Sequence, residues 1–241
     1  IWPAYIPPGQ TPVLANGGTE YFLSSNLGFD NFNQIAVWAL TNTSSLNTDN
    51  PNLRLRMTVV DTLAYHFPEF SVPQKNGFHP LGESLGFPVA DLDAGPDSIS
   101  SCEYVNGHVW GTLSSAMKDG NGSTIEVVAY FAFTPQITNG TLTASRFTQG
   151  IVAAPGRFLM YPAIALNKNN IGTIVFSLSS PNDYPSAAFV PIRDTSRGAI
   201  QISREGNEPE DGFTCYPPFS DGVCRWGDYS AGAVNNVDQT S

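Results

Sequence analysis

Residues 101–115 read SCEYVNGHVWGTLSS and indicate two β-strands joined by a tight turn. Apolar side chains recur at alternate positions around Asn106 and Gly107, a dipeptide that favours the two-residue turn between antiparallel strands. Two more strand-like segments follow, at 125–134 and 143–153. The stretch therefore predicts a unit of four antiparallel strands.

The same order of segments recurs along the chain. Another set occupies 161–166, 171–180, 186–192 and 199–203, and a partial set near the start occupies 20–25, 34–41 and 53–61. The triplet Leu-Ser-Ser ends a segment in each set, at 23–25, 113–115 and 178–180. A repeated four-stranded antiparallel unit is typical of a β-propeller blade.

We therefore expect an all-β chain in which residues 1–241 form one portion of a β-propeller. The predicted blades are 13–63, 99–154 and 159–204, and 225–234 is the predicted first strand of a further blade. The alternative is a β-sandwich or jelly roll, because short strands and turns are common to all three classes.

Three blades are fewer than the four to eight that a propeller ring requires, because each blade packs against two neighbours. Two apolar blade faces would remain in contact with water. The sequence thus predicts that a second polypeptide, or a copy of the same chain, completes the ring.

The charge of the chain limits its partners. Only 13% of the residues are charged, and 21 acidic against 11 basic side chains leave a net charge of −10. Nucleic acid and anionic membrane surfaces are excluded as partners by a field of this sign. The start, Ile1-Trp2-Pro3-Ala4, has neither the initiator Met nor the pattern of a signal peptide, so we expect that the chain was cut from a longer one.

Two features predict a secreted protein. Asn42, Asn121 and Asn139 each begin an Asn-x-Ser/Thr sequon in a polar, turn-like stretch, where an N-linked glycan can project into water. Cys215 and Cys224 flank a short loop whose ends can meet in a disulfide, the alternative being two buried free thiols. Cys102 is then left either buried in a strand or bonded to a part of the protein outside this chain.

Several segments resemble one family. GFTCY at 212–216 and RWGDYSA at 225–231 resemble a signature of large, uncharacterised secreted proteins of bacteria and fungi that are predicted to be β-propellers. YPAI at 161–164, YPSA at 184–187 and VWG at 109–111 are also similar to that group, so the resemblance covers most of the chain after about Ile35. It implies a propeller fold and secretion, and a fungal source would fit the sequons. It implies no reaction.

An acidic loop is a candidate metal site. Asp91, Asp93 and Asp97 occupy positions 1, 3 and 7 of a loop that contains a glycine, and Ca²⁺ takes six to eight oxygen ligands. The alternative is a solvated turn in which aspartate side chains accept backbone hydrogen bonds. Pro96 and the missing terminal glutamate depart from the helix-flanked calcium loop.

The candidate ligand-binding residues are Arg225, Trp226, Asp228 and Tyr229, on the strand expected to lie nearest the propeller channel. An arginine and an aspartate beside aromatic rings suit a sugar or a carboxylate. The structural alternative is an Arg225–Asp228 pair that holds the loop, while both aromatic rings fill the space between blades.

A second acidic cluster, Glu205, Glu208, Glu210 and Asp211, contains the carboxyl groups that glycoside cleavage needs. A solvated charged loop is the favoured explanation, because sequence alone does not bring two of them together. His66, His79 and His108 are isolated and show no zinc-binding spacing. No nucleophile motif or phosphate-binding loop is present.

Two functions follow from these observations. The first is a secreted propeller that binds or processes extracellular glycans, with the reaction and even the presence of enzyme activity left open. The second is a non-enzymatic scaffold that assembles with a second chain. The fold alone does not choose between them, because propellers carry many unrelated functions.

Overall fold

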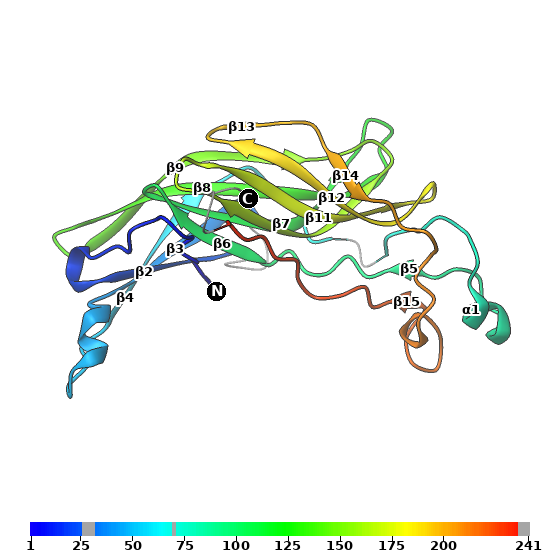
Figure 1. Cartoon of the computed structure of the whole chain (residues 1–241), viewed down its shortest axis with the longest axis horizontal. Coiled ribbons are helices and arrows are strands. Elements are labelled where there is room, and N and C mark those ends of the chain that lie inside the picture. Colours follow the sequence, from blue (N-terminus) through cyan, green and yellow to red (C-terminus); the bar gives the residue numbers. More distant parts are fainter. Residues whose placement is uncertain (26–31, 69–70, 236–241) are drawn as a thin grey trace.

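A computed structural model gives the architecture and describes residues 1–25, 32–68 and 71–235 (Figure 1). Strands take up 48% of the chain and helices 7%, and of the three large antiparallel sheets two are four-stranded and one is five-stranded. The prediction of an all-β chain is therefore confirmed.

Three antiparallel sheets follow one another along the chain. The first sheet has the order β1 (Trp2–Pro3), β2 (Thr19–Ser24), β3 (Gln34–Thr41), β4 (Arg54–Asp61). The second has the order β6 (Ser101–Val105), β7 (His108–Lys118), β8 (Thr124–Thr138), β9 (Thr141–Val152). The third consists of β10 (Phe158–Leu166), β11 (Ile171–Ser180) and β12 (Asp183–Arg193), and the short strands β13 (Ser196–Arg197) and β14 (Gln201–Arg204) share the position beyond β12.

Smaller elements lie between and after these sheets. The strands β5 (Asp91–Leu92) and β15 (Val223–Cys224) pair in parallel, and α1 spans Pro80–Leu85. Three 3₁₀ turns complete the set: η1 (Ala15–Gly17), η2 (Thr43–Asn47) and η3 (Phe213–Cys215). β5, β15, α1 and η3 form a loop region beside the sheets, whereas η1 and η2 lie in the connections between strands of the first sheet (Figure 1).

The hairpin turns confirm the local reading of the sequence. Asn106 and Gly107 join β6 to β7 with φ angles of 49° and 85°. Asn139 and Gly140 join β8 to β9 with φ angles of 51° and 76°. Both turns have positive φ at both central positions, which Asn-Gly tolerates best and which matches the twist of the flanking strands.

The sheets pack face to face in chain order. Leu23 and Val37 of the first sheet share one apolar core with Leu113 and Phe131 of the second. Another core lies between the second and third sheets and includes Trp110, Tyr130, Ile174 and Phe176. Over the described ranges, the sheets close into neither a barrel nor a ring.

The first sheet begins earlier than the predicted range 13–63. Its first edge strand is β1, where Trp2 lies opposite Leu23 of β2 and Pro3 lies opposite Phe22. A two-residue strand that contains proline shows no alternation of polar and apolar side chains, so the sequence did not reveal it.

Two of the three Leu-Ser-Ser triplets mark equivalent places in space, because Leu113 of β7 and Leu178 of β11 each pack toward the sheet that precedes their own. Leu23 packs toward the second sheet, whereas Leu113 packs from the second sheet toward the first, so the two side chains meet in one core. The order of strands repeats in all three sheets, whereas the placement of this triplet repeats only in the second and third.

Residues 225–234 pair with none of the described strands. Gly232 instead lies against β10, so closely that a Cβ atom on it would be 2.6 Å from the Cβ of Ala165. A strand needs a neighbouring backbone to complete its hydrogen bonds. The role of 225–234 as the first strand of a further blade therefore stays a prediction.

Leu113 tests the core between the first two sheets. Leu113→Ala should lower the free energy of unfolding by about 2–5 kcal/mol, because the side chain is fully buried and its loss leaves a cavity. Met117→Ala on the same strand is the matched control, because Met117 is 38% exposed, and it should cost less than about 1 kcal/mol. Urea unfolding measures both, and equal costs would contradict the assigned packing.

Candidate ligand-binding cleft at the inner edge

Each of the three sheets begins with an edge strand, and these strands, β1, β6 and β10, lie next to one another along what we call the inner edge. The chain after β1 continues beside β6, where the Tyr5 N–H donates to the carbonyl of Cys102 at 2.9 Å. The N–H of Tyr104 donates back to the Tyr5 carbonyl at 2.8 Å, and Tyr5 lies opposite Glu103 in a parallel bridge. Backbone hydrogen bonds thus join the first sheet to the second.

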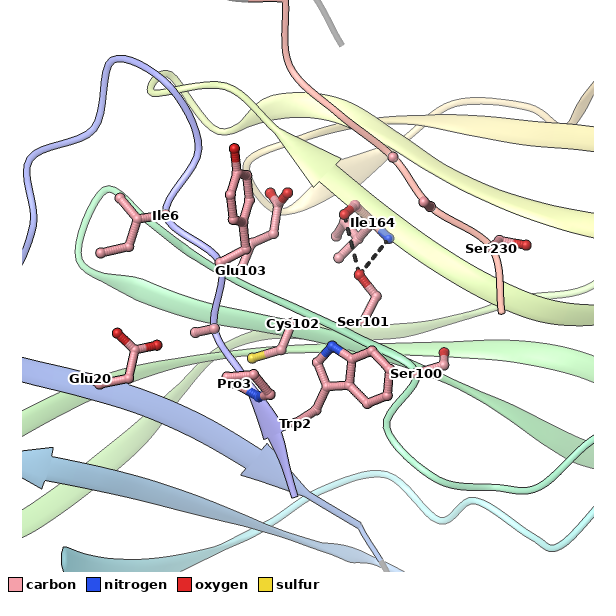
Figure 2. Close-up of a pocket in the computed structure, with 14 residues that line it drawn as sticks. Trp2, Pro3, Ile6, Glu20, Ser100, Ser101, Cys102, Glu103, Ile164 and Ser230 are labelled. Atoms are coloured by element: carbon pink, nitrogen blue, oxygen red, sulfur yellow. Dashed lines mark hydrogen bonds between the residues drawn. The ribbon is translucent and has the colours of Figure 1, made fainter. Parts of the chain in front are cut away.

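Side chains of β6 join the second sheet to the third. The Leu166 N–H donates to Oε2 of Glu103 at 2.8 Å. The Ile164 N–H donates to Oγ of Ser101 at 3.2 Å, and this hydroxyl lies 3.4 Å from the Ile164 carbonyl oxygen (Figure 2). Ser101 and Glu103 are two residues apart, as are Ile164 and Leu166. Alternate side chains of β6 therefore accept hydrogen bonds from alternate backbone N–H groups of β10.

Burial changes the acid–base chemistry of this edge. Glu103 is only 3% exposed, and burial raises its pKa to about 8, although the hydrogen bond from Leu166 acts in the opposite direction. Burial also raises the pKa of Glu20. The pKa of the Cys102 thiol is raised by burial and, to a smaller extent, by the negative charges of Glu103 and Glu20. Glu103 therefore keeps its proton in most molecules at neutral pH.

A large hollow of about 600 Å³ opens along the inner edge (Figure 2). Its walls come from the first residues of the chain, from β6, from Ile164 of β10 and from the last described segment. Two carboxyl groups, those of Glu20 and Glu103, line it together with the hydroxyls of Ser100, Ser101 and Ser230. The hollow thus combines hydrogen-bonding groups with the aromatic side chains of Trp2 and Tyr5.

A smaller hollow of about 220 Å³ adjoins the large one, because Trp2 and Ser100 line both. Asp228 and Tyr229 line the small hollow, and the ring centroids of Trp2 and Tyr229 are 5.5 Å apart. Tyr229 is 70% exposed and Tyr5 is 56% exposed. The two hollows share part of their walls, and we call them together the inner-edge cleft, in which Tyr5 and Tyr229 are accessible aromatic rings.

Tyr161, in the wall of the small hollow, has a strained backbone. Its φ angle is 51°, and it lies where the pairing of β10 with β11 is interrupted between Met160 and Ala163. Its N–H donates to Ser114 Oγ and its hydroxyl donates to the Asp93 carbonyl, both at 3.1 Å. A bulky residue with positive φ costs about 1–3 kcal/mol and is held by its surroundings, a condition often found at functional sites.

The structure divides the four predicted ligand-binding residues. Asp228 and Tyr229 line the cleft, whereas Trp226 packs against the loop core that contains Cys215 and Cys224. Arg225 forms an exposed ion pair with Asp228, with 2.5 Å between Nη2 and Oδ1. The pairing foreseen as the structural alternative is therefore present, but such an exposed pair stabilises the fold little.

The predicted calcium loop does not gather its carboxylates. Asp91 accepts a hydrogen bond from the Ser71 hydroxyl, Asp93 accepts one from the Gly95 N–H at 2.8 Å, and Asp97 is 2% exposed with no hydrogen-bond partner for Oδ2. In the part of the chain that the structure describes, no three His, Cys, Asp or Glu side chains are grouped closely enough to hold a metal ion. Asp93 accepts a backbone hydrogen bond as the turn alternative foresaw, but the segment is not a solvated turn, because Asp97 is buried.

The disulfide between Cys215 and Cys224 is confirmed, and Cys102 is a free thiol buried in β6. The acidic loop beside the disulfide has a structural role at Asp211 and at Glu210, whose Oε1 accepts from the Gly212 N–H at 3.1 Å. Asp211 accepts hydrogen bonds from the N–H groups of Leu81 and Gly82, at 2.7 and 2.9 Å, at the start of α1. Glu205 and Glu208 are exposed, as expected for a solvated loop.

The three sequons differ in accessibility. Asn121 and Asn139 are exposed in turns, where a glycan has room. Asn42 is half-buried, and its side-chain amide donates to the Asn52 carbonyl at 2.8 Å, so attachment of a glycan there would break a hydrogen bond.

Sequence reasoning missed most of the cleft. Glu103 carried one signal, an acidic residue inside a segment predicted to be a strand, where an unpaired charge is costly. Trp2, Tyr5 and Glu20 carried none, because their position at the inner edge depends on contacts with β6. Tyr161 was noted only for the Tyr-Pro pair.

The chain matches no protein-family model, no curated protein and no solved structure in the comparisons made. No helix within the described ranges has the length and apolar character needed to cross a membrane.

The proton on Glu103 makes stability depend on pH. The folded pKa of about 8 lies above the ordinary value of 4.5, so the unfolded chain releases this proton first as pH rises. Between these two pH values, the contribution of Glu103 to stability should decrease by up to about 1.4 kcal/mol per pH unit. Glu103→Gln removes this dependence, because an amide oxygen still accepts from Leu166 but does not titrate.

Urea unfolding of both proteins at pH 5 and pH 8 checks this. The variant should gain up to about 4 kcal/mol relative to the wild type between the two pH values. Glu208→Gln, at an exposed position, is the matched control and should show no such gain. A Glu103→Gln effect that is the same at both pH values would show that Glu103 is ionised in the folded protein.

Proposed function

We propose that this chain is part of a secreted β-propeller and that it binds neutral extracellular glycans in the inner-edge cleft. The observation that carries the proposal is the row of aromatic rings, Tyr5, Trp2 and Tyr229, beside carboxyl and hydroxyl groups in two adjoining hollows. Sugars present apolar C–H faces and many hydroxyls, so a cleft that offers rings and hydrogen-bonding groups suits them.

The arrangement of the sheets supports a propeller. In each of the three sheets the first strand in sequence is the innermost, and β1, β6 and β10 lie next to one another along one edge. In a propeller the corresponding edge of each blade surrounds the central channel. Residues 230–232 also line the large hollow, and Gly232 lies against Ala165 of β10.

The charge of the cleft favours neutral sugars over acidic ones. Glu20 and Asp228 are the carboxyl groups beside the aromatic rings, and the chain carries a net charge of −10. An anionic sugar would be repelled by this field. Glu103, with its proton retained, can donate a hydrogen bond to a sugar oxygen.

Secretion is supported by chemistry elsewhere in the chain. The Cys215–Cys224 disulfide persists in an oxidising compartment, and Asn121 and Asn139 are exposed sequons. The resemblance of 225–231 to large secreted bacterial and fungal proteins supports the same location. Whether the bound glycan is cleaved is a separate property of the cleft, which product analysis of the binding mixtures would detect.

A glycan-array screen with neutral cell-wall oligosaccharides, followed by titration calorimetry, tests the proposal. Tyr229→Ala and Tyr5→Ala should each weaken binding about tenfold, equivalent to about 1.4 kcal/mol, because each removes an accessible ring from the cleft. Phe78→Ala is the matched control, because Phe78 is 63% exposed and lines neither hollow. If the wild-type protein binds no neutral glycan, the non-enzymatic scaffold function takes the place of this one.

A further inference from the structure

The outer strand of the first sheet exposes a row of apolar side chains. Leu55, Met57 and Val59 of β4 point to the same side and are 57%, 48% and 40% exposed. Their partners on β3 are Leu40 and Trp38, which are half-buried, and Ala36, which is fully buried, so the same side of the sheet is apolar across both strands. We call these six residues the leading face of the first sheet.

Each sheet has a leading face and a trailing face, on opposite sides. The leading face of the second sheet, with Leu113 and Phe131, packs on the trailing face of the first. The leading face of the third sheet, with Ile174 and Phe176, packs on the trailing face of the second. Both internal interfaces therefore follow one rule: a leading face covers the trailing face of the sheet before it.

The three sheets share one orientation, which makes their leading faces equivalent. Tyr5 pairs with Glu103 in parallel, and the contacts of Ser101 with Ile164 and of Glu103 with Leu166 also run in parallel. The strands follow the same order from the inner edge outward in every sheet. Sheets with the same strand direction and the same strand order turn the same face forward.

Two faces are left over by this rule. One is the leading face of the first sheet, and the other is the trailing face of the third, where Val175 of β11 lies beside Phe189 of β12. Both residues are half-buried, and the neighbouring Ala187 is exposed on the same side. One of these two faces is a trailing face and the other is a leading face, and this is the pair of faces that meets in both internal interfaces.

We infer that a second copy of this chain covers these faces. The trailing face of the third sheet of each copy packs on the leading face of the first sheet of the other, so two identical contacts close a ring of two chains. Continuity with the two internal interfaces selects this arrangement over a contact between two copies of the same face. The inference is independent of glycan binding, because none of these residues lines the cleft.

Light scattering coupled to size-exclusion chromatography gives the mass of the purified protein. The wild type should elute at about twice the chain mass of 25.9 kDa. Met57→Glu should shift it to the mass of one chain, because the contact would bury an unpaired carboxylate. Leu46→Glu, at a 58% exposed leucine outside both faces, is the matched control and should leave the two-chain mass unchanged.

A charge pair separates this arrangement from its alternatives. Ala187→Lys alone should also give single chains, and mixing it with Met57→Glu should restore the two-chain mass, because one contact then pairs Glu with Lys and the other is unaltered. Circular dichroism of each variant checks that it is folded. A single-chain wild type, a Met57→Glu protein of two-chain mass or an Ala187→Lys protein of two-chain mass would each overturn the inference.

Discussion

The hydrogen bonds along the inner edge join the three sheets strand to strand, in addition to the apolar faces between them and to scattered side-chain bonds such as that of Tyr161 with Ser114. Ile164 and Leu166 of β10 are buried, and β11 pairs with the other edge of their strand. Without Ser101 and Glu103, their N–H groups would be buried and unpaired, at a cost of about 1–3 kcal/mol each. The Glu103 carboxyl is buried where it accepts the hydrogen bond from Leu166, and this burial raises its pKa.

The same edge carries the cleft. The floor of the large hollow lies on β6, which both neighbouring sheets hold in place, whereas Tyr229 lies on a segment that belongs to no described sheet. A rigid floor with an accessible ring at its rim suits a ligand that is oriented by hydrogen bonds and covered by stacking. The strained Tyr161 has the same origin, since its hydrogen bonds to Ser114 and Asp93 hold a backbone conformation that an isolated strand would not adopt.

Face-to-face packing explains both the stability of the middle of the molecule and the exposure at its ends. The second sheet has both faces covered and supplies side chains such as Phe131 and Trp110 to two cores. The first and third sheets each have only one face covered in this way, so residues such as Met57 remain at the surface. In a ring of two chains the inner edges would lie around one axis, and the clefts of both copies would face the same channel.

The sequence by itself determined the features that depend on neighbours along the chain. Alternation of side chains predicted the strands, Asn-Gly predicted the hairpin turn at 106–107, and the short loop between Cys215 and Cys224 predicted the disulfide. Only the tertiary structure decided that β1 completes the first sheet. It also decided that Asp211 accepts hydrogen bonds from the N–H groups at the start of α1 and that Glu103 accepts one from Leu166, 63 positions away. It also left Asp91, Asp93 and Asp97 without a common centre. Local backbone preferences act within a few residues and leave their pattern in the sequence, whereas contacts between sheets depend on how whole elements pack, which no short pattern records.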